Sequence, residues 1–237
     1  MKYLHNRNGI AFFIYILSAV VQRVYFHFSG RTVYRYAFAY GLFQEEYTEG
    51  IPYMDLLAVC LPIVFLLLYF SGNYVCYVEG YGRLLMIRNY SKGRMIVQQC
   101  FFMSAALLFF EVIEVLIWGI GDQGYECFKI PLYQVFITYY LSLCAAVFLQ
   151  YLLETFLSVQ AANLMTIVYL VTSEFVMEKA DGSLLAFVFF PAFITVEHGR
   201  QNLNSIYEIS GIWLYLAFLS IGFIAASVWI CRKKDIY

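Results

Sequence analysis

The 237-residue sequence has little charge, because only 13 % of its residues are Asp, Glu, Lys or Arg. A soluble domain usually carries about 25 % charged residues, so this chain lacks the charge that would cover a soluble surface. Hydrophobic residues instead make up 62 % of the sequence, and its mean hydropathy is +0.71. The composition excludes an ordinary soluble globular protein and predicts an integral membrane protein.

Motifs for nucleotide, metal and redox chemistry are also missing from the sequence. Nothing fits the phosphate-binding pattern G-x-x-x-x-G-K-[ST], so the chain cannot bind and hydrolyse ATP in the usual way. Five of the six cysteines lie in or beside apolar runs, and their spacing fits neither a disulfide framework nor a metal knuckle. The three histidines, His5, His27 and His198, are far apart. We therefore expect no catalytic residue, no bound cofactor, no metal and no nucleic-acid partner for this chain.

Long apolar runs are what the sequence does contain. Spanning about 30 Å of hydrocarbon takes about 20 helical residues. Six runs meet this length, so we expect one all-α transmembrane domain over residues 1–237. The expected spans are Ile10–Phe28, Asp55–Cys76, Cys100–Ile120, Tyr133–Leu153, Leu157–Met177 and Ser210–Cys231. The fourth and fifth spans are separated by only a few residues around Glu154, which predicts a tight helical hairpin.

The distribution of Lys and Arg predicts that both termini are cytoplasmic. With that orientation, nine basic residues lie inside, and five lie outside on longer loops. Most acidic residues then fall outside. The inner set is Lys2, Arg7, Arg83, Arg88, Lys92, Arg94, Arg232, Lys233 and Lys234, and the outer set is Arg31, Arg35, Lys129, Lys179 and Arg200.

Two outer segments differ from ordinary loops. Ser29–Met54 is long and contains the acidic stretch QEEYTEG. Glu178–Glu208 contains SLLAFVFFPAFITV, which is too short to span a membrane and too apolar for a solvated loop. Pro191 in its middle would break a helix. We expect this second segment to form a half-inserted helical hairpin before the last span.

The cytoplasmic segment Tyr77–Cys100 is charged but patterned. Apolar residues recur at three- and four-residue spacing around Gly80–Tyr90, which predicts a short amphipathic helix. Ser91 follows and can cap a second helix that leads into the third span. One interpretation is an interfacial helix with its arginines on lipid phosphates, and another is a docking helix for a soluble partner; both roles can coexist.

This layout resembles that of the permease subunits of type 2 (ABC-2) ABC exporters, similar to the membrane subunits of bacterial peptide toxin and lantibiotic exporters. The resemblance in sequence lies in the stretch VEGYGRLLMIRNYSKGRMIVQQ and in the ending WICRKKDIY. Many members begin with a longer interfacial helix, where this chain has only nine residues before the first expected span.

The resemblance implies a specific role for the amphipathic helix. In that family it is the coupling helix, which sits in a cleft of a separate ATPase subunit. It also implies two ATPase copies that bind ATP and Mg, a second permease subunit, by default in a homodimer, and an amphipathic or hydrophobic peptide as cargo. The implied location is the bacterial cytoplasmic membrane. The residues that would contact the ATPase are Glu79, Tyr81, Arg83, Leu84, Leu85 and Arg88.

Ionisable residues inside the expected spans are the remaining candidates for function. Glu111 and Glu114 are three residues apart and share a helix face. Each ionised carboxylate at such a depth costs roughly 2.5–3.5 kcal/mol, so both should face the bundle, a partner or water. Three interpretations stay open: a structural ion pair with Arg23, the lining of a path for a cationic substrate, and a proton relay. Glu174 lies at a comparable depth.

A rival hypothesis comes from another class of protein. A stand-alone secondary transporter or channel would use Glu111, Glu114 and Arg23 as its functional charges. The pair Glu45–Glu46 also invites comparison with intramembrane proteases that use a Glu-Glu pair. It lies in an outer loop, however, and Gly50 stands where such enzymes have Arg.

Overall fold

The computed structural model describes residues 2–29, 36–41, 53–76, 91–120, 132–179, 188–195 and 209–233. Every regular element in these ranges is helical. By length and composition, five of the helices can cross a membrane. They are α1 (Lys2–Phe28), α3 (Tyr53–Phe70), α5 (Lys92–Gly119), α6 (Leu132–Leu153) and α10 (Ile209–Lys233). The predicted all-α membrane architecture is therefore confirmed for the described residues.

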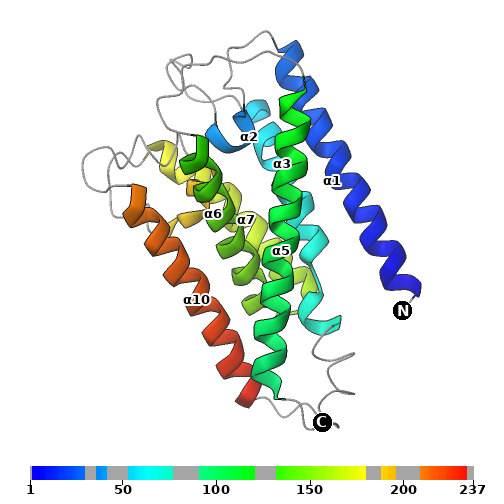
Figure 1. The fold of residues 1–237 in the computed structure, drawn as a ribbon, viewed down its shortest axis with the longest axis vertical. Coiled ribbons are helices and arrows are strands. Elements are labelled where there is room, and N and C mark those ends of the chain that lie inside the picture. The colour runs from blue at the N-terminus through cyan, green and yellow to red at the C-terminus, as the bar shows by residue number, and fades with distance from the viewer. Residues whose placement is uncertain are drawn as a thin grey trace.

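The long helices lie side by side in one bundle (Figure 1). The beginning of α1 and the end of α10 lie toward the same end of this bundle, as do the end of α3 and the beginning of α5. Three basic residues at these helix ends, Arg94, Arg232 and Lys233, are exposed. The arrangement agrees with the predicted placement of both termini on one side, and we call this the basic end of the bundle.

Two helix boundaries differ from the expected spans. The second span was expected to continue to Cys76, but α3 ends at Phe70, and Gly72 follows with φ of 79°, a backbone conformation that favours glycine. The third span was expected to begin at Cys100, but α5 begins at Lys92. The predicted cap is confirmed, because the Arg94 amide donates to Ser91 Oγ at 3.4 Å. The capped helix and the third span are thus one continuous helix.

The N-terminal residues continue the first helix. We expected the span to begin near Ile10, and the part of α1 that qualifies as membrane-crossing is Gly9–Phe28. The helix itself begins at Lys2, so residues 2–8 continue it on the N-terminal side of the span.

The fifth expected span corresponds to α7 (Val159–Lys179), which packs against α6 and α3. It is not among the five helices that qualify as membrane-crossing in the described part of the chain. The polar residues Asn163, Thr166 and Glu174 on this helix are all buried. The short connection between α6 and α7, residues 154–158, confirms the predicted hairpin, while a sixth crossing stays a prediction.

The apolar segment before the last helix is packed inside the bundle. Residues 190–194 form the 3-10 helix η3 (Phe190–Ile194), with Pro191 in its first turn. All five are buried, and the element contacts α6 and α7. The rest of the expected outer hairpin, 178–208, lies largely outside the described residues, so the hairpin stays a prediction and the structure describes one 3-10 turn of it.

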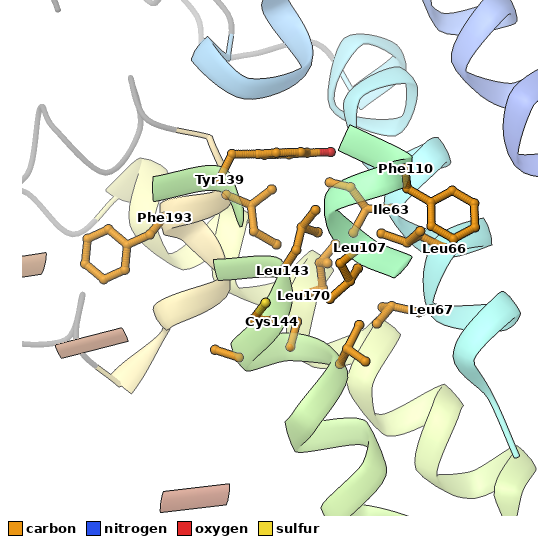
Figure 2. Packing of buried hydrophobic residues seen from close by; sticks show 14 of the residues in the cluster. Ile63, Leu66, Leu67, Leu107, Phe110, Tyr139, Leu143, Cys144, Leu170 and Phe193 are labelled. Carbon is orange, nitrogen blue, oxygen red and sulfur yellow. The ribbon is translucent and has the colours of Figure 1, made fainter. Parts of the chain in front are cut away.

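Helix α6 is the centre of the bundle, because it contacts α3, α5, α7, α10, the short α2 (Ala37–Tyr40) and η3. Figure 2 shows how its residues Leu143 and Cys144 lie among side chains from several other elements. Small residues allow this close packing: Ala145 and Ala146 are buried on α6. The other labelled core residues are Ile63, Leu66, Leu67, Leu107, Phe110, Tyr139, Leu170 and Phe193.

Helix α5 also approaches α10 closely at the basic end. A Cβ atom at Gly93 would lie 3.1 Å from Val228 Cγ1 and 3.2 Å from a terminal guanidinium nitrogen of Arg232. Glycine at this position therefore lets the two helices meet.

We predict that Gly93→Leu destabilises the protein, because a larger side chain cannot fit between α5 and α10. Overpacking of this kind costs about 1–3 kcal/mol of unfolding free energy. The matched control is Gly222→Leu, since a Cβ at Gly222 meets nothing within 4 Å and the residue is exposed. Denaturant titration in mixed micelles measures both. Equal stability of the two variants would contradict the close approach at Gly93.

Candidate functional site

The two intramembrane glutamates of α5 are both buried, at 6 % exposure for Glu111 and 1 % for Glu114. Glu114 faces α6, where the Tyr139 hydroxyl donates to its Oε2 at 2.7 Å. The Tyr15 hydroxyl of α1 lies near the same carboxyl and near the Phe110 carbonyl oxygen, at 3.3 Å from the latter. Glu114 therefore joins α1, α5 and α6.

Glu111 has different surroundings, although it lies one turn away on the same helix. It interacts electrostatically with Glu114, but among the described residues no hydrogen bond reaches its carboxyl. It lines a groove between α5 and α6. Glu111 and Glu114 share a helix face by their spacing in sequence, but in the structure their carboxyl groups have different surroundings.

Arg23 of α1 lies beside an aromatic ring. Its guanidinium carbon is 5.2 Å from the centre of the Trp118 ring, a distance at which a cation–π interaction is favourable. Trp118 Nε1 in turn donates to Gln22 Oε1 at 3.4 Å, and Gln22 Nε2 donates to the Val59 carbonyl at 3.3 Å. This chain links α1, α3 and α5. Arg23 packs on Trp118 and Glu114 contacts Tyr139, so the two side chains belong to two neighbouring clusters.

Helix α2 covers these clusters at the end of the bundle opposite the basic end (Figure 1). Its Phe38 is buried and contacts the rings of Tyr139, Trp118 and Phe136, at centroid distances of 5.1, 6.1 and 6.3 Å. The part of the segment Ser29–Met54 that the structure describes therefore includes a helical turn that packs into the bundle against Tyr139, the partner of Glu114.

A further buried glutamate lies at the basic end, in the turn between α6 and α7. Glu154 is 4 % exposed, and its two carboxyl oxygens accept the backbone amides of Gly72 and Tyr74, at 2.7 and 3.2 Å. The ring of Tyr74 packs edge-on against Tyr151 of α6 at 5.5 Å. We call this contact the Glu154 clamp. It fastens the chain just after α3 to the α6–α7 turn.

Sequence reasoning missed the role of Glu154. The residue was treated only as the acidic centre of a short connection. A sequence signal does exist, since a lone acid between two apolar spans has no basic neighbour to pair with and must find donors elsewhere. The partners themselves lie 82 and 80 residues away in sequence, so only the tertiary structure identifies them.

Glu174 on α7 also has a partner from a distant segment. Thr195 follows η3, and its hydroxyl donates to Glu174 Oε2 at 3.2 Å. Glu174 therefore anchors the buried apolar segment to α7.

The predicted coupling-helix residues, Glu79 to Arg88, lie outside the described residues. Both ends of this segment are described. Tyr74 in the Glu154 clamp precedes it, and Ser91 at the start of α5 follows it. Within the described ranges, no group of three or more His, Cys, Asp or Glu residues is placed to hold a metal ion.

These observations define the class: an all-helical, multi-pass membrane protein with buried carboxyls at both ends of the bundle. The chain belongs to the DUF2705 family, described as proteins of unknown function, whose family model matches residues 15–237. No curated protein and no solved structure matches the chain.

We predict that Tyr139→Phe lowers the unfolding free energy by about 1–3 kcal/mol, because a buried Glu114 oxygen loses its donor. The control is Tyr133→Phe, since Tyr133 is 59 % exposed on the same helix. Adding Glu114→Gln to the Tyr139 variant should recover part of the loss and give a non-additive double-mutant cycle. Additive effects would show that the two side chains do not interact.

Proposed function

We propose that this protein is the membrane permease subunit of an ABC exporter, working as a dimer with a separate ATPase. The observation that carries the proposal is the position of residues 77–90. They connect α3 to α5 along the chain, the described ends of these two helices lie at the basic end of the bundle, and the sequence of residues 77–90 resembles the coupling helix of ABC-2 permeases. The proposal also includes six spans with both termini in the cytoplasm.

The physics of driven transport requires a rigid connection between the motor and the spans. Closure of two ATPase subunits must move the helices as rigid bodies, and a short helix wedged into the motor can transmit that motion. The segment 77–90 is joined covalently to α3 and α5. The capped start of α5 at Ser91 favours a stiff joint on one side of the segment.

The Glu154 clamp extends this connection to two more helices. Because Glu154 accepts amides from Gly72 and Tyr74, a displacement of the segment's first end is passed to the turn between α6 and α7. A carboxylate that accepts two backbone amides forms charge-assisted hydrogen bonds, which are stronger than neutral ones. A movement of residues 77–90 would then be transmitted to four helices, α3, α5, α6 and α7.

The proposed division of labour leaves ATP chemistry to the partner. Two ATPase copies would bind ATP and Mg, while this chain and a second copy would form the pathway. An amphipathic or hydrophobic peptide, such as a toxin or antimicrobial, is the proposed cargo, and the bacterial cytoplasmic membrane is the proposed location. A stand-alone secondary transporter or channel that uses Glu111, Glu114 and Arg23 remains the alternative.

Co-purification separates the two hypotheses. The tagged chain would be extracted in mild detergent from its native host and its mass determined together with any bound protein. A soluble ATPase at equal copy number supports the exporter. A partnerless species that mediates ion-coupled flux in liposomes would overturn it.

We predict that Arg83→Glu with Arg88→Glu abolishes stimulation of the ATPase, because two reversed charges oppose docking. Membrane insertion should not change. The matched control is Arg94→Glu, since Arg94 is exposed at the same end but lies outside the predicted contact. Unchanged stimulation in the double variant would refute docking through this segment.

We also predict that Glu154→Ala uncouples the ATPase while leaving it bound. Without the clamp, motor closure moves α3 and α5 but reaches α6 and α7 weakly, so cargo-dependent ATPase stimulation should fall about fivefold or more. Gln160→Ala is the control, because Gln160 is exposed near the same turn. If the variant instead loses both ATPase binding and ATPase stimulation, the role of Glu154 is purely structural.

A further inference from the structure

The groove between α5 and α6 has a volume of about 330 Å³. Its α5 wall consists of residues at helical spacing over about 12 Å of helix, from Leu108 to Leu116. This volume is at the lower end of the range of small-molecule sites in proteins. The lining residues are Leu108, Glu111, Val112, Val115, Leu116, Phe136, Ile137 and Tyr140.

The α6 wall of the groove is held in place by contacts outside it. The ring of Phe136 packs against Tyr36 and Phe38, at centroid distances of 5.4 and 6.3 Å. The Tyr140 hydroxyl donates to the carbonyl of Ser104, a residue that does not line the groove, at 3.1 Å. The aromatic walls are therefore pre-organised, which lowers the entropy cost of binding.

One polar group interrupts this apolar surface. The side chain of Glu111 is buried, at 6 % exposure, and it lines the groove. No described residue donates a hydrogen bond to its carboxyl. None of the groove's lining residues is Lys, Arg or His. A carboxyl in such surroundings is costly unless a donor or cation meets it. An incoming ligand can supply this missing hydrogen-bond donor or cation.

We propose that this groove binds a hydrophobic amine, with the ammonium on Glu111 and the apolar body between α5 and α6. Three features of the site require this ligand class. The carboxyl selects a cationic donor, the aliphatic face of α5 selects an apolar body, and the Phe136 and Tyr140 rings favour an aromatic group. The ligand reaches the groove from the bilayer, since Leu108, Val112 and Leu116 are exposed on the surface of the bundle.

The neighbouring Glu114 is the internal comparison for this assignment. It is the same residue type on the same helix, but its Oε2 accepts a hydrogen bond from Tyr139 and it does not line the groove. The site therefore requires Glu111 and not simply a buried carboxyl. The inference does not rest on the transport proposal, because it concerns binding to this chain without a motor.

The test is equilibrium binding to the purified full chain in lipid nanodiscs. The probe is radiolabelled 4-phenylbutylamine, and 4-phenylbutanol is its neutral counterpart of nearly the same shape. Empty nanodiscs correct for partition into lipid. The amine should bind saturably and about tenfold or more tightly than the alcohol, because a hydrogen bond to a charged group is stronger than one between neutral groups.

Two substitutions in the groove distinguish its charge from its shape. Glu111→Gln keeps the shape, so it should weaken the amine about tenfold and leave the alcohol unchanged. Val112→Trp fills the groove and should weaken both probes. Glu114→Gln is the matched control and should change the affinity of the amine less than about twofold. Size-exclusion elution and thermal unfolding verify that each variant is folded.

Several results would overturn the assignment. Equal affinity for the amine and the alcohol in the unsubstituted protein would remove the role of charge. Equal losses in Glu111→Gln and Glu114→Gln, with both variants folded, would show an indirect effect. Efficient cross-linking between two copies through a Val112→Cys substitution would show that a second copy covers the groove.

Discussion

Buried carboxyl groups depend on partners for their stability in an apolar bundle, and this requirement organises the polar contacts of the protein. Four glutamates are buried in the described part of the chain. Glu114 has Tyr139, Glu154 has the amides of Gly72 and Tyr74, and Glu174 has Thr195. Each contact joins elements that are distant in sequence. The cost of burying a charge is thus offset by contacts that also position the helices.

Glu111 departs from that pattern, because no described residue donates a hydrogen bond to it, and this is the basis of the proposed ligand site. A structural carboxyl is satisfied within the protein, whereas a binding carboxyl must keep its acceptor oxygens available to a ligand. The groove between α5 and α6 surrounds Glu111 with apolar surface. The same physical rule therefore accounts for three glutamates whose contacts join parts of the bundle and for the one that we propose binds a ligand.

The proposed exporter function depends on a different property, which is mechanical connection. The hydrophobic effect does not hold helices together in lipid, because lipid tails are as apolar as the side chains. Directional contacts such as the Glu154 clamp therefore fix the relative position of the elements that they join. If residues 77–90 dock on a motor, the clamp and the capped start of α5 are the two joints through which force enters the bundle.

Local sequence patterns were sufficient to predict several elements. The apolar runs predicted the five membrane-length helices, since helix formation in lipid depends on length and hydropathy, and the hydroxyl of Ser91 predicted the start of α5. The early end of α3 was missed, because the apolar residues Tyr74, Val75 and Cys76 were included in the span although the turn-forming residues Ser71, Gly72 and Asn73 precede them. The roles of the glutamates were decided by tertiary structure alone. Glu111 and Glu114 look equivalent in sequence, because they are three residues apart. Helix packing places Glu114 beside Tyr139 and Glu111 in the groove between α5 and α6. Glu154 finds its donors only when distant segments meet, because the partner of a buried polar group is set by three-dimensional packing and not by sequence distance.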